Sequence, residues 1–217
     1  MADFATARLR MVDNQLRTSA VTDHRVLTAM GDVPREAFLP ADREALAYAD
    51  VTHALGGDRF LAAPAPFAKL LQLAEIIHTD RVLDVGAGTG YSTAVLARLG
   101  AHVTGLEPDP ALAAKARANF AAAGVANAEI STSGFDGDGL PLDHFDVIVV
   151  EGALDAEPAS LFHLLRDGGR LVALIDAGGS GVAHIFVKSG GEVAGRSEFN
   201  TTLPPLAAAP RTETFVF

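Results

Sequence analysis

The sequence predicts an α/β protein with a mainly parallel sheet, an antiparallel C-terminal edge and an N-terminal helical cap. Three observations support this. From residue 81 onward, short apolar runs alternate with helical patterns, which is typical of a parallel sheet. A glycine-rich turn follows the first run, at residues 86–90. The first 31 residues instead carry apolar side chains at helical spacing.

The N-terminal region is expected to form two helices within residues 3–31. Thr22 or Asp23 can cap the second helix, and Val33-Pro34 ends it because a residue before proline disfavours the α conformation. A third short helix is expected at residues 40–47, a loop at 51–63 and a helix at 66–77. The first helix has an apolar stripe that contains Phe4, Leu9, Val12 and Leu16.

The rest of the chain is expected to build the sheet. Strands are predicted at 81–85, 102–106, 128–132, 145–150 and 170–175, and helices at 90–99, 109–123 and 157–166. Residues 182–188, 192–200 and 212–217 are expected to form antiparallel strands at the sheet edge. Residues 203–210 contain three prolines and are not expected in a central strand.

The glycine turn and an acidic residue after the second strand form a nucleoside-binding pattern. The turn reads Asp84-x-Gly86-x-Gly88-x-Gly90, and Glu107 ends the strand that follows. Glycine lets a ligand approach the backbone, and a carboxylate at this place can accept both hydroxyls of a ribose. An acid before the turn suits a cationic ligand better than a pyrophosphate. A dinucleotide site, which has the spacing G-x-G-x-x-G, and a purely structural turn are the alternatives.

Composition limits the function further. The 217 residues carry a net charge of −10, which disfavours nucleic-acid binding, and contain no cysteine that could act as a nucleophile. The sequence shows no signal peptide and no apolar run long enough to span a membrane, so a soluble cytoplasmic protein is expected. The seven histidines form no H-x-x-x-H pair, and no metal site is assigned.

The chain resembles class I S-adenosylmethionine-dependent methyltransferases in its glycine turn, and protein-L-isoaspartate O-methyltransferases over most of its length. The second resemblance rests on residues 11–17, 23–27, 33–40, 47–50, 145–149 and 168–172, which read MVDNQLR, DHRVL, VPREAFLP, AYAD, FDVIV and GGRLV. It implies a Rossmann-like methyltransferase fold, with residues 1–65 as the helical cap and substrate loop and 66–217 as the cofactor-binding domain. Gln15, Arg17 and Arg35 either belong to this family pattern or lie on a solvated helix face.

The resemblance implies transfer of a methyl group from S-adenosylmethionine to a carboxylate of an isoaspartyl residue in a damaged protein. A carboxylate is already nucleophilic at neutral pH, so catalysis needs positioning rather than a strong base. Phe135 is expected to pack against adenine, Asp136 either accepts its amino group or lies in an acidic loop, and Glu151 faces either the methyl-transfer site or solvent. The predicted cofactor-binding residues are Asp84, Gly86, Gly88, Thr89, Gly90, Glu107, Pro108, Phe135, Asp136 and Glu151.

The substrate loop departs from the family pattern. The family carries a serine two residues before a proline, and that serine helps to bind the isoaspartyl carboxylate. Here Ala62 stands at that position, Phe60 replaces a threonine and Arg59 replaces a glutamine. A hydroxyl donor is therefore lost. Arg59 and Ala62 are the candidate catalytic positions, and Arg59 either pairs with a carboxylate or lies on the surface.

The altered loop leaves two rival functions open. One is a relative that kept the cofactor site but methylates another acceptor. The other is a cofactor-binding protein with little catalysis that acts through a partner. The expected partner is a protein or peptide with an isoaspartyl residue, and the expected state is a monomer or a small homo-oligomer.

Overall fold

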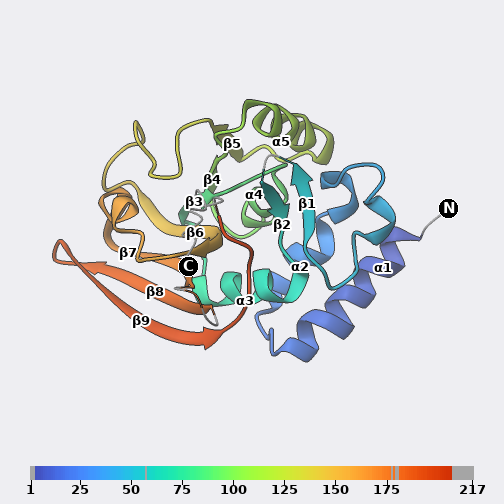
Figure 1. The fold of residues 1–217 in the computed structure, drawn as a ribbon, viewed down its shortest axis with the longest axis horizontal. Helices are drawn as coiled ribbons and strands as arrows, with labels where there is room; N and C mark the ends of the chain where they lie inside the picture. The colour runs from blue at the N-terminus through green and yellow to red at the C-terminus, as the bar shows by residue number, and fades with distance from the viewer. Residues whose placement is uncertain (1–2, 57, 177, 179–180, 207–217) are drawn as a thin grey trace, which may run out of the picture.

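The computed structural model describes residues 3–56, 58–176, 178 and 181–206. A seven-stranded sheet lies at its centre, with the order β5-β4-β3-β6-β7-β8-β9 (Figure 1). The first five strands in this order pair in parallel, and β8 and β9 pair antiparallel at one edge, which confirms the predicted fold class. The strands are β3 (Arg81–Val85), β4 (His102–Leu106), β5 (Ala128–Ser131), β6 (Phe145–Leu154), β7 (Leu165–Ile175), β8 (Val182–Ser189) and β9 (Glu192–Asn200).

Each buried strand sends alternate side chains to two cores, because successive residues of a strand face opposite sides of the sheet. Val147 and Val149 of β6 join the core under the helices, whereas Ile148 and Val150 join the core on the other face. Strands buried on both faces explain the continuous apolar runs in the sequence. The first face is covered by α3 (Pro64–Ala74), α4 (Tyr91–Leu96) and α5 (Pro110–Ala123).

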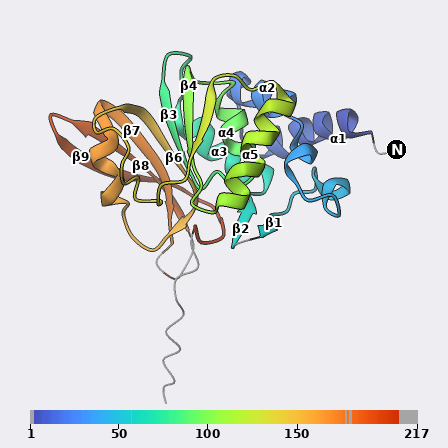
Figure 2. The same ribbon diagram turned by 90° about the horizontal axis from the view of Figure 1, so that it is seen from above.

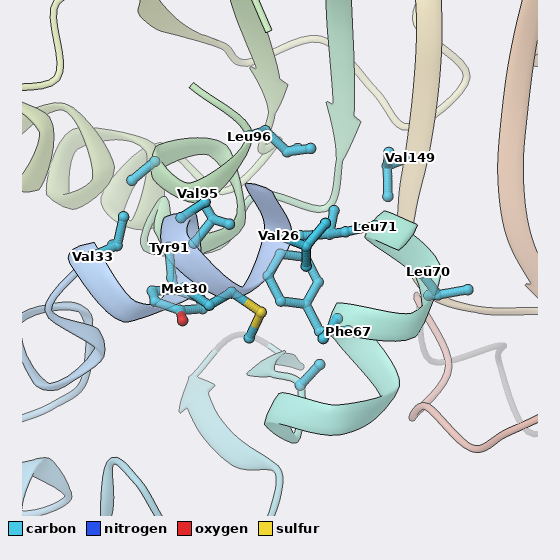
Figure 3. Close-up of a cluster of buried hydrophobic side chains, with 14 of the residues drawn as sticks. Val26, Met30, Val33, Phe67, Leu70, Leu71, Tyr91, Val95, Leu96 and Val149 are labelled. Carbon is cyan, nitrogen blue, oxygen red and sulfur yellow. The ribbon is translucent and has the colours of Figure 1, made fainter. Parts of the chain in front are cut away.

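The N-terminal segment shares the first of these cores. α1 (Phe4–Met11) continues through one π-helical turn, η1 (Val12–Leu16), and a 3-10 turn, η2 (Arg17–Ser19), and α2 (His24–Asp32) follows. Asp23 caps α2 by accepting a bond of 2.8 Å from the Arg25 amide, which selects it over Thr22. Figure 3 shows side chains of α2, α3, α4 and β6 packed together. The division of the chain at residue 65 stays a prediction, since this core crosses it.

Three local predictions were wrong. Residues 40–47 form turns and one 3-10 segment, η4 (Glu44–Leu46), rather than an α-helix. Residues 157–166 contain the 3-10 helix η5 (Ala159–Leu164), and β7 begins at its end. The predicted loop at 51–63 contains an antiparallel hairpin, β1 (His53–Gly56) with β2 (Arg59–Leu61). The predicted strand at 212–217 lies outside the described residues.

Figure 2 shows the N-terminal helices gathered at one end of the sheet, with β1 and β2 on the same side of the molecule as α5. The hairpin therefore stands near the carboxyl ends of β3 and β4, where parallel sheets bind ligands. Among the described helices, none is long and apolar enough to cross a membrane.

Candidate active site

The glycine turn after β3 brings the backbone to the carboxyl edge of the sheet. Gly86 has a φ of 97° and Gly88 a φ of 55°, a region that favours glycine. A Cβ on Gly86 would lie 2.6 Å from the Leu206 side chain, and one on Gly88 would lie 2.8 Å from the Leu55 side chain. The positive φ therefore favours glycine at both positions, and a Cβ would also require the Leu206 or Leu55 side chain to move. Thr89 and Gly90 complete the turn, and the Thr89 hydroxyl donates to the Phe38 carbonyl over 2.6 Å.

Glu107 directly follows β4 and is fully buried beside this turn. Its Oε2 accepts a bond of 2.9 Å from the Gly88 amide, and its Oε1 accepts one of 3.0 Å from the Asp109 amide. Burial raises the pKa of Glu107, and the two amide bonds offset part of that rise. Each carboxylate oxygen has a second lone pair, so the side chain can still accept ribose hydroxyls. Pro108 lies between the two amide-bonded segments of the loop.

Asp84 and Glu151 are two further acids buried at the same edge. Ser92 donates to Asp84 Oδ2 over 2.7 Å and Thr93 over 2.5 Å, but Asp84 Oδ1 has no hydrogen-bond partner within the described residues. Burial raises the pKa of Asp84 to about 6. Burial and the neighbouring Asp84 charge raise the pKa of Glu151 well above its ordinary value. Such acids favour a cationic ligand.

A cavity of about 460 Å³ opens on the other face of the sheet, at the end of β6. Phe135, which is half-buried, and Asp136, which is exposed, lie on its wall. Its remaining lining is mainly apolar, a chemistry that suits a flat heterocycle such as adenine. The other lining side chains include Val150, Leu154, Leu161 and Leu206.

Arg59 does not lie on the surface. It is buried between the glycine turn and this cavity, with Nε 3.9 Å from Glu107 Oε2 and its guanidinium 4.6 Å from the centre of the Phe135 ring. It also donates to the Leu206 carbonyl. The carboxylate that Arg59 meets is thus Glu107, on the cofactor side, and its side chain is separate from the small pocket that holds Ala62.

Ala62 lines a small pocket of about 10 Å³, together with Phe60, Glu151 and Arg35. Arg35 is fully buried and donates to the carbonyls of Ala47 and Ala62, over 2.8 Å and 2.6 Å. The prediction that Arg35 could lie on a solvated helix face is therefore wrong. Arg17 is exposed, as a position on a solvated face requires. Glu151 is buried and faces this pocket rather than solvent. The remaining lining residues are Leu55, Leu61, Phe67, Gly86, Ala87, Tyr91 and Ser92.

Residues 203–206 are part of the site and carry no signal in the sequence beyond their prolines. The Ala153 amide donates to the Pro204 carbonyl and the Leu206 amide to the Ala153 carbonyl, both over 2.9 Å. This backbone pairing lays Leu206 over Gly86 and Gly152. Within the described ranges, no group of three or more acidic, histidine or cysteine side chains could hold a metal ion.

The residues at this edge fit S-adenosylmethionine. Asp84 leaves a buried oxygen without a partner among the described residues, which suits the positively charged end of this cofactor, and the glycine turn has the positive φ angles that favour glycine. Glu107 can accept hydroxyls, and the apolar cavity beside it can hold a ring.

Comparisons with known proteins agree with this chemistry. The family model described as protein-L-isoaspartate(D-aspartate) O-methyltransferase matches residues 7–209. A protein-L-isoaspartate O-methyltransferase of Methanoregula boonei is 41% identical over 184 residues, which cover 83% of this chain and 82% of that protein. One of Koribacter versatilis is 41% identical over 175 residues, covering 79% of this chain and 78% of that protein.

Solved structures agree at the level of the fold. A structure from Plasmodium falciparum, assigned to protein-L-isoaspartate O-methyltransferases and solved with S-adenosyl-L-homocysteine, has a TM-score of 0.79 at 20% identity and covers 95% of this chain and 99% of that chain. A further protein-L-isoaspartate O-methyltransferase has a TM-score of 0.77 at 24% identity, covering 91% of this chain and 65% of that chain. The family model and the relatives at 41% identity establish that this chain belongs to the protein-L-isoaspartate O-methyltransferase family of class I methyltransferases.

Proposed function

We propose that this protein transfers a methyl group from S-adenosylmethionine to the carboxylate of an isoaspartyl residue in a damaged protein or peptide. The observation that carries the proposal is the group of three buried acids, Asp84, Glu107 and Glu151, around a glycine turn that leads to the Ala62 pocket. The family relationship supports the substrate class.

The chain's own residues would act mainly by positioning. Glu107, with Gly88, would hold the ribose, Phe135 and Asp136 would contact the adenine, and Asp84 would face the cationic end of the cofactor. Bound S-adenosylmethionine would supply an electrophilic methyl group on its sulfonium. No base is needed, because a carboxylate acceptor is ionised at neutral pH, and alignment of the reactants supplies the rate. Thr89, Gly90 and Pro108 would hold the shape of the turn.

Arg59 would close the cofactor side rather than bind the acceptor. It links the hairpin β1–β2 to Glu107 and to the Leu206 carbonyl. Its stacking over Phe135 supports the wall of the proposed adenine cavity. This role explains why a buried arginine stands in the substrate loop.

The surroundings of the enzyme are part of the proposal. An acidic chain, with a net charge of −10, disfavours nucleic acid as partner. We infer a cytoplasmic enzyme, monomeric or a small homo-oligomer, that acts on protein or peptide substrates.

Cofactor choice gives the first test. Calorimetry should show binding of S-adenosylmethionine and S-adenosylhomocysteine and none of NAD or ATP. Tighter binding of NAD would contradict the proposal, since the acid at position 84 would then face a pyrophosphate.

A further inference from the structure

Glu151 lies near position 62, where the substrate loop lacks a hydroxyl donor. Ala62 and Glu151 line the same small pocket, one from the end of β2 and the other from β6. Gly86 lies between the cofactor side and this pocket, and a Cβ on it would be 3.5 Å from the Glu151 Cβ. Glu151 therefore stands where the cofactor side meets the proposed acceptor side.

The side chain of Glu151 has an open hydrogen-bonding position. It is 7% exposed, and its Oε1 has no partner among the described residues. A buried polar atom without a partner is costly, which indicates that a bound molecule satisfies it. Besides Glu151, the ionisable side chains that line the pocket are Arg35 from η3 (Arg35–Phe38) and Tyr91 from α4. Asp84 from β3 does not line it, but its charge acts on Glu151.

We propose that Glu151, in its protonated form, donates a hydrogen bond to the acceptor carboxylate and so replaces the missing hydroxyl at position 62. This inference rests on the proposed function. Burial and the charge of the neighbouring Asp84 raise the pKa of Glu151 well above its ordinary value, which favours the protonated form that can donate.

The chemistry balances without transfer of the Glu151 proton. An acceptor oxygen forms a bond to the methyl carbon while the bond between sulfur and that carbon breaks, and sulfur keeps the electron pair. The Glu151 proton stays on its carboxyl group and only orients the acceptor. Glu151 is thus a binding residue for the acceptor, and Phe60, which narrows the pocket, must move aside when the acceptor enters.

Three variants test the proposal on an isoaspartyl peptide. Glu151→Ala should lower kcat/KM about ten- to a hundred-fold, the range for a lost hydrogen bond to a charged group. Glu151→Gln keeps an N–H donor and should stay within about threefold of the unmodified protein. Adding Ala62→Ser to Glu151→Ala should restore most of the lost activity. Ala62→Ser alone should change kcat/KM by about threefold or less, because the unmodified protein already has a donor.

Two further readouts separate this role from structural or cofactor roles. Binding of S-adenosylhomocysteine and the thermal unfolding midpoint should be unchanged in Glu151→Gln. Activity of the unmodified protein should fall as pH rises through the Glu151 pKa, whereas Glu151→Gln should lack this fall. Glu192→Ala, an exposed acid on β9, is the matched control and should match the unmodified protein throughout.

Several results would overturn the proposal. These are full activity in Glu151→Ala, no rescue by Ala62→Ser, or weaker S-adenosylhomocysteine binding in Glu151→Gln, which would assign Glu151 to the cofactor cation. Failure of the proposed function looks different: the unmodified protein would bind S-adenosylhomocysteine yet methylate no isoaspartyl peptide.

Discussion

The two halves of the site are built by different means. On the cofactor side, Glu107 receives two backbone amides, and the glycine turn takes its shape from positive φ angles. On the proposed acceptor side, Ala62 and Phe60 are apolar, and Glu151 leaves a buried oxygen without a partner among the described residues. A half held by the backbone tolerates little change, whereas a half made by side chains can be altered one residue at a time. The comparison explains how this chain keeps the family's cofactor chemistry with a different substrate loop.

The largest expected effect tests whether the cofactor side depends on the backbone. Gly86→Val should abolish S-adenosylhomocysteine binding in calorimetry, since its Cβ would meet Leu206 at 2.6 Å and its φ of 97° disfavours any side chain. Gly124→Val is the control for strain alone, because Gly124 has a φ of 65° and no atom within 4 Å of an added Cβ. Equal binding in both variants would mean that the turn does not approach the cofactor.

The second effect concerns the buried acid of the same half. Glu107→Ala should weaken S-adenosylhomocysteine binding about ten- to a hundred-fold, because hydrogen bonds to a charged acceptor contribute roughly 1.5–3 kcal/mol. Glu129→Ala, which removes an acid with a side chain 66% exposed, should change nothing. An unchanged dissociation constant in Glu107→Ala, with the protein folded, would remove Glu107 from the cofactor site.

The third effect is a pH dependence. The pKa of Asp84 is raised to about 6, so below pH 6 it is mainly protonated and has lost the charge that favours a cationic ligand. Affinity for S-adenosylhomocysteine should therefore rise up to about tenfold between pH 5 and pH 7 and then level off. Calorimetry over this range measures it.

Asp84→Asn gives the control for this pH dependence and should flatten the rise. The sign is opposite for the free energy of unfolding without ligand. An acid whose folded pKa is raised stabilises the fold at low pH, and this contribution is lost as pH increases through about 6. Affinity that falls as pH rises from 5 to 7 would contradict the role of Asp84. The raised pKa values of Glu107 and Glu151 change the free energy of unfolding with pH in the same direction as that of Asp84.

The smallest expected effect concerns Arg59, which lies between the cofactor side and the proposed acceptor side. Arg59→Leu should weaken S-adenosylhomocysteine binding only a few-fold, since it removes a stacking contact worth about 0.5–2 kcal/mol and an ion pair at 3.9 Å. The KM for the isoaspartyl peptide should stay within about twofold, since the Arg59 side chain lies apart from the Ala62 pocket. A large rise in that KM alone would return Arg59 to the acceptor site.

The same contrast explains what the sequence could predict. The strands and the glycine turn follow from local patterns, since residues 82–85 are apolar except for Asp84 and the turn needs residues that accept positive φ. Glu107 was predictable because only one helix and one strand, α4 and β4, separate it from the turn along the chain. These features depend on neighbours in the chain and on the backbone.

The rest depends on distant contacts. The sequence does not decide whether Arg59 pairs with a carboxylate or lies on the surface. Only the fold shows that Arg59 contacts Glu107 and the Leu206 carbonyl. Burial of Arg35 and the open oxygen of Glu151 likewise come from packing between separate elements. The 3-10 helix at 159–164 was expected as an α-helix because six residues between a proline and a strand carry too little periodicity to separate the two.

Methyl-ester formation on an isoaspartyl peptide, with the matching aspartyl peptide as control, tests directly whether this protein methylates isoaspartyl residues. In the presence of S-adenosylmethionine, the unmodified protein should methylate the isoaspartyl peptide and not the aspartyl peptide. No methylation of the isoaspartyl peptide by a folded protein that binds S-adenosylhomocysteine would contradict it, and would show that the altered loop serves another acceptor or none.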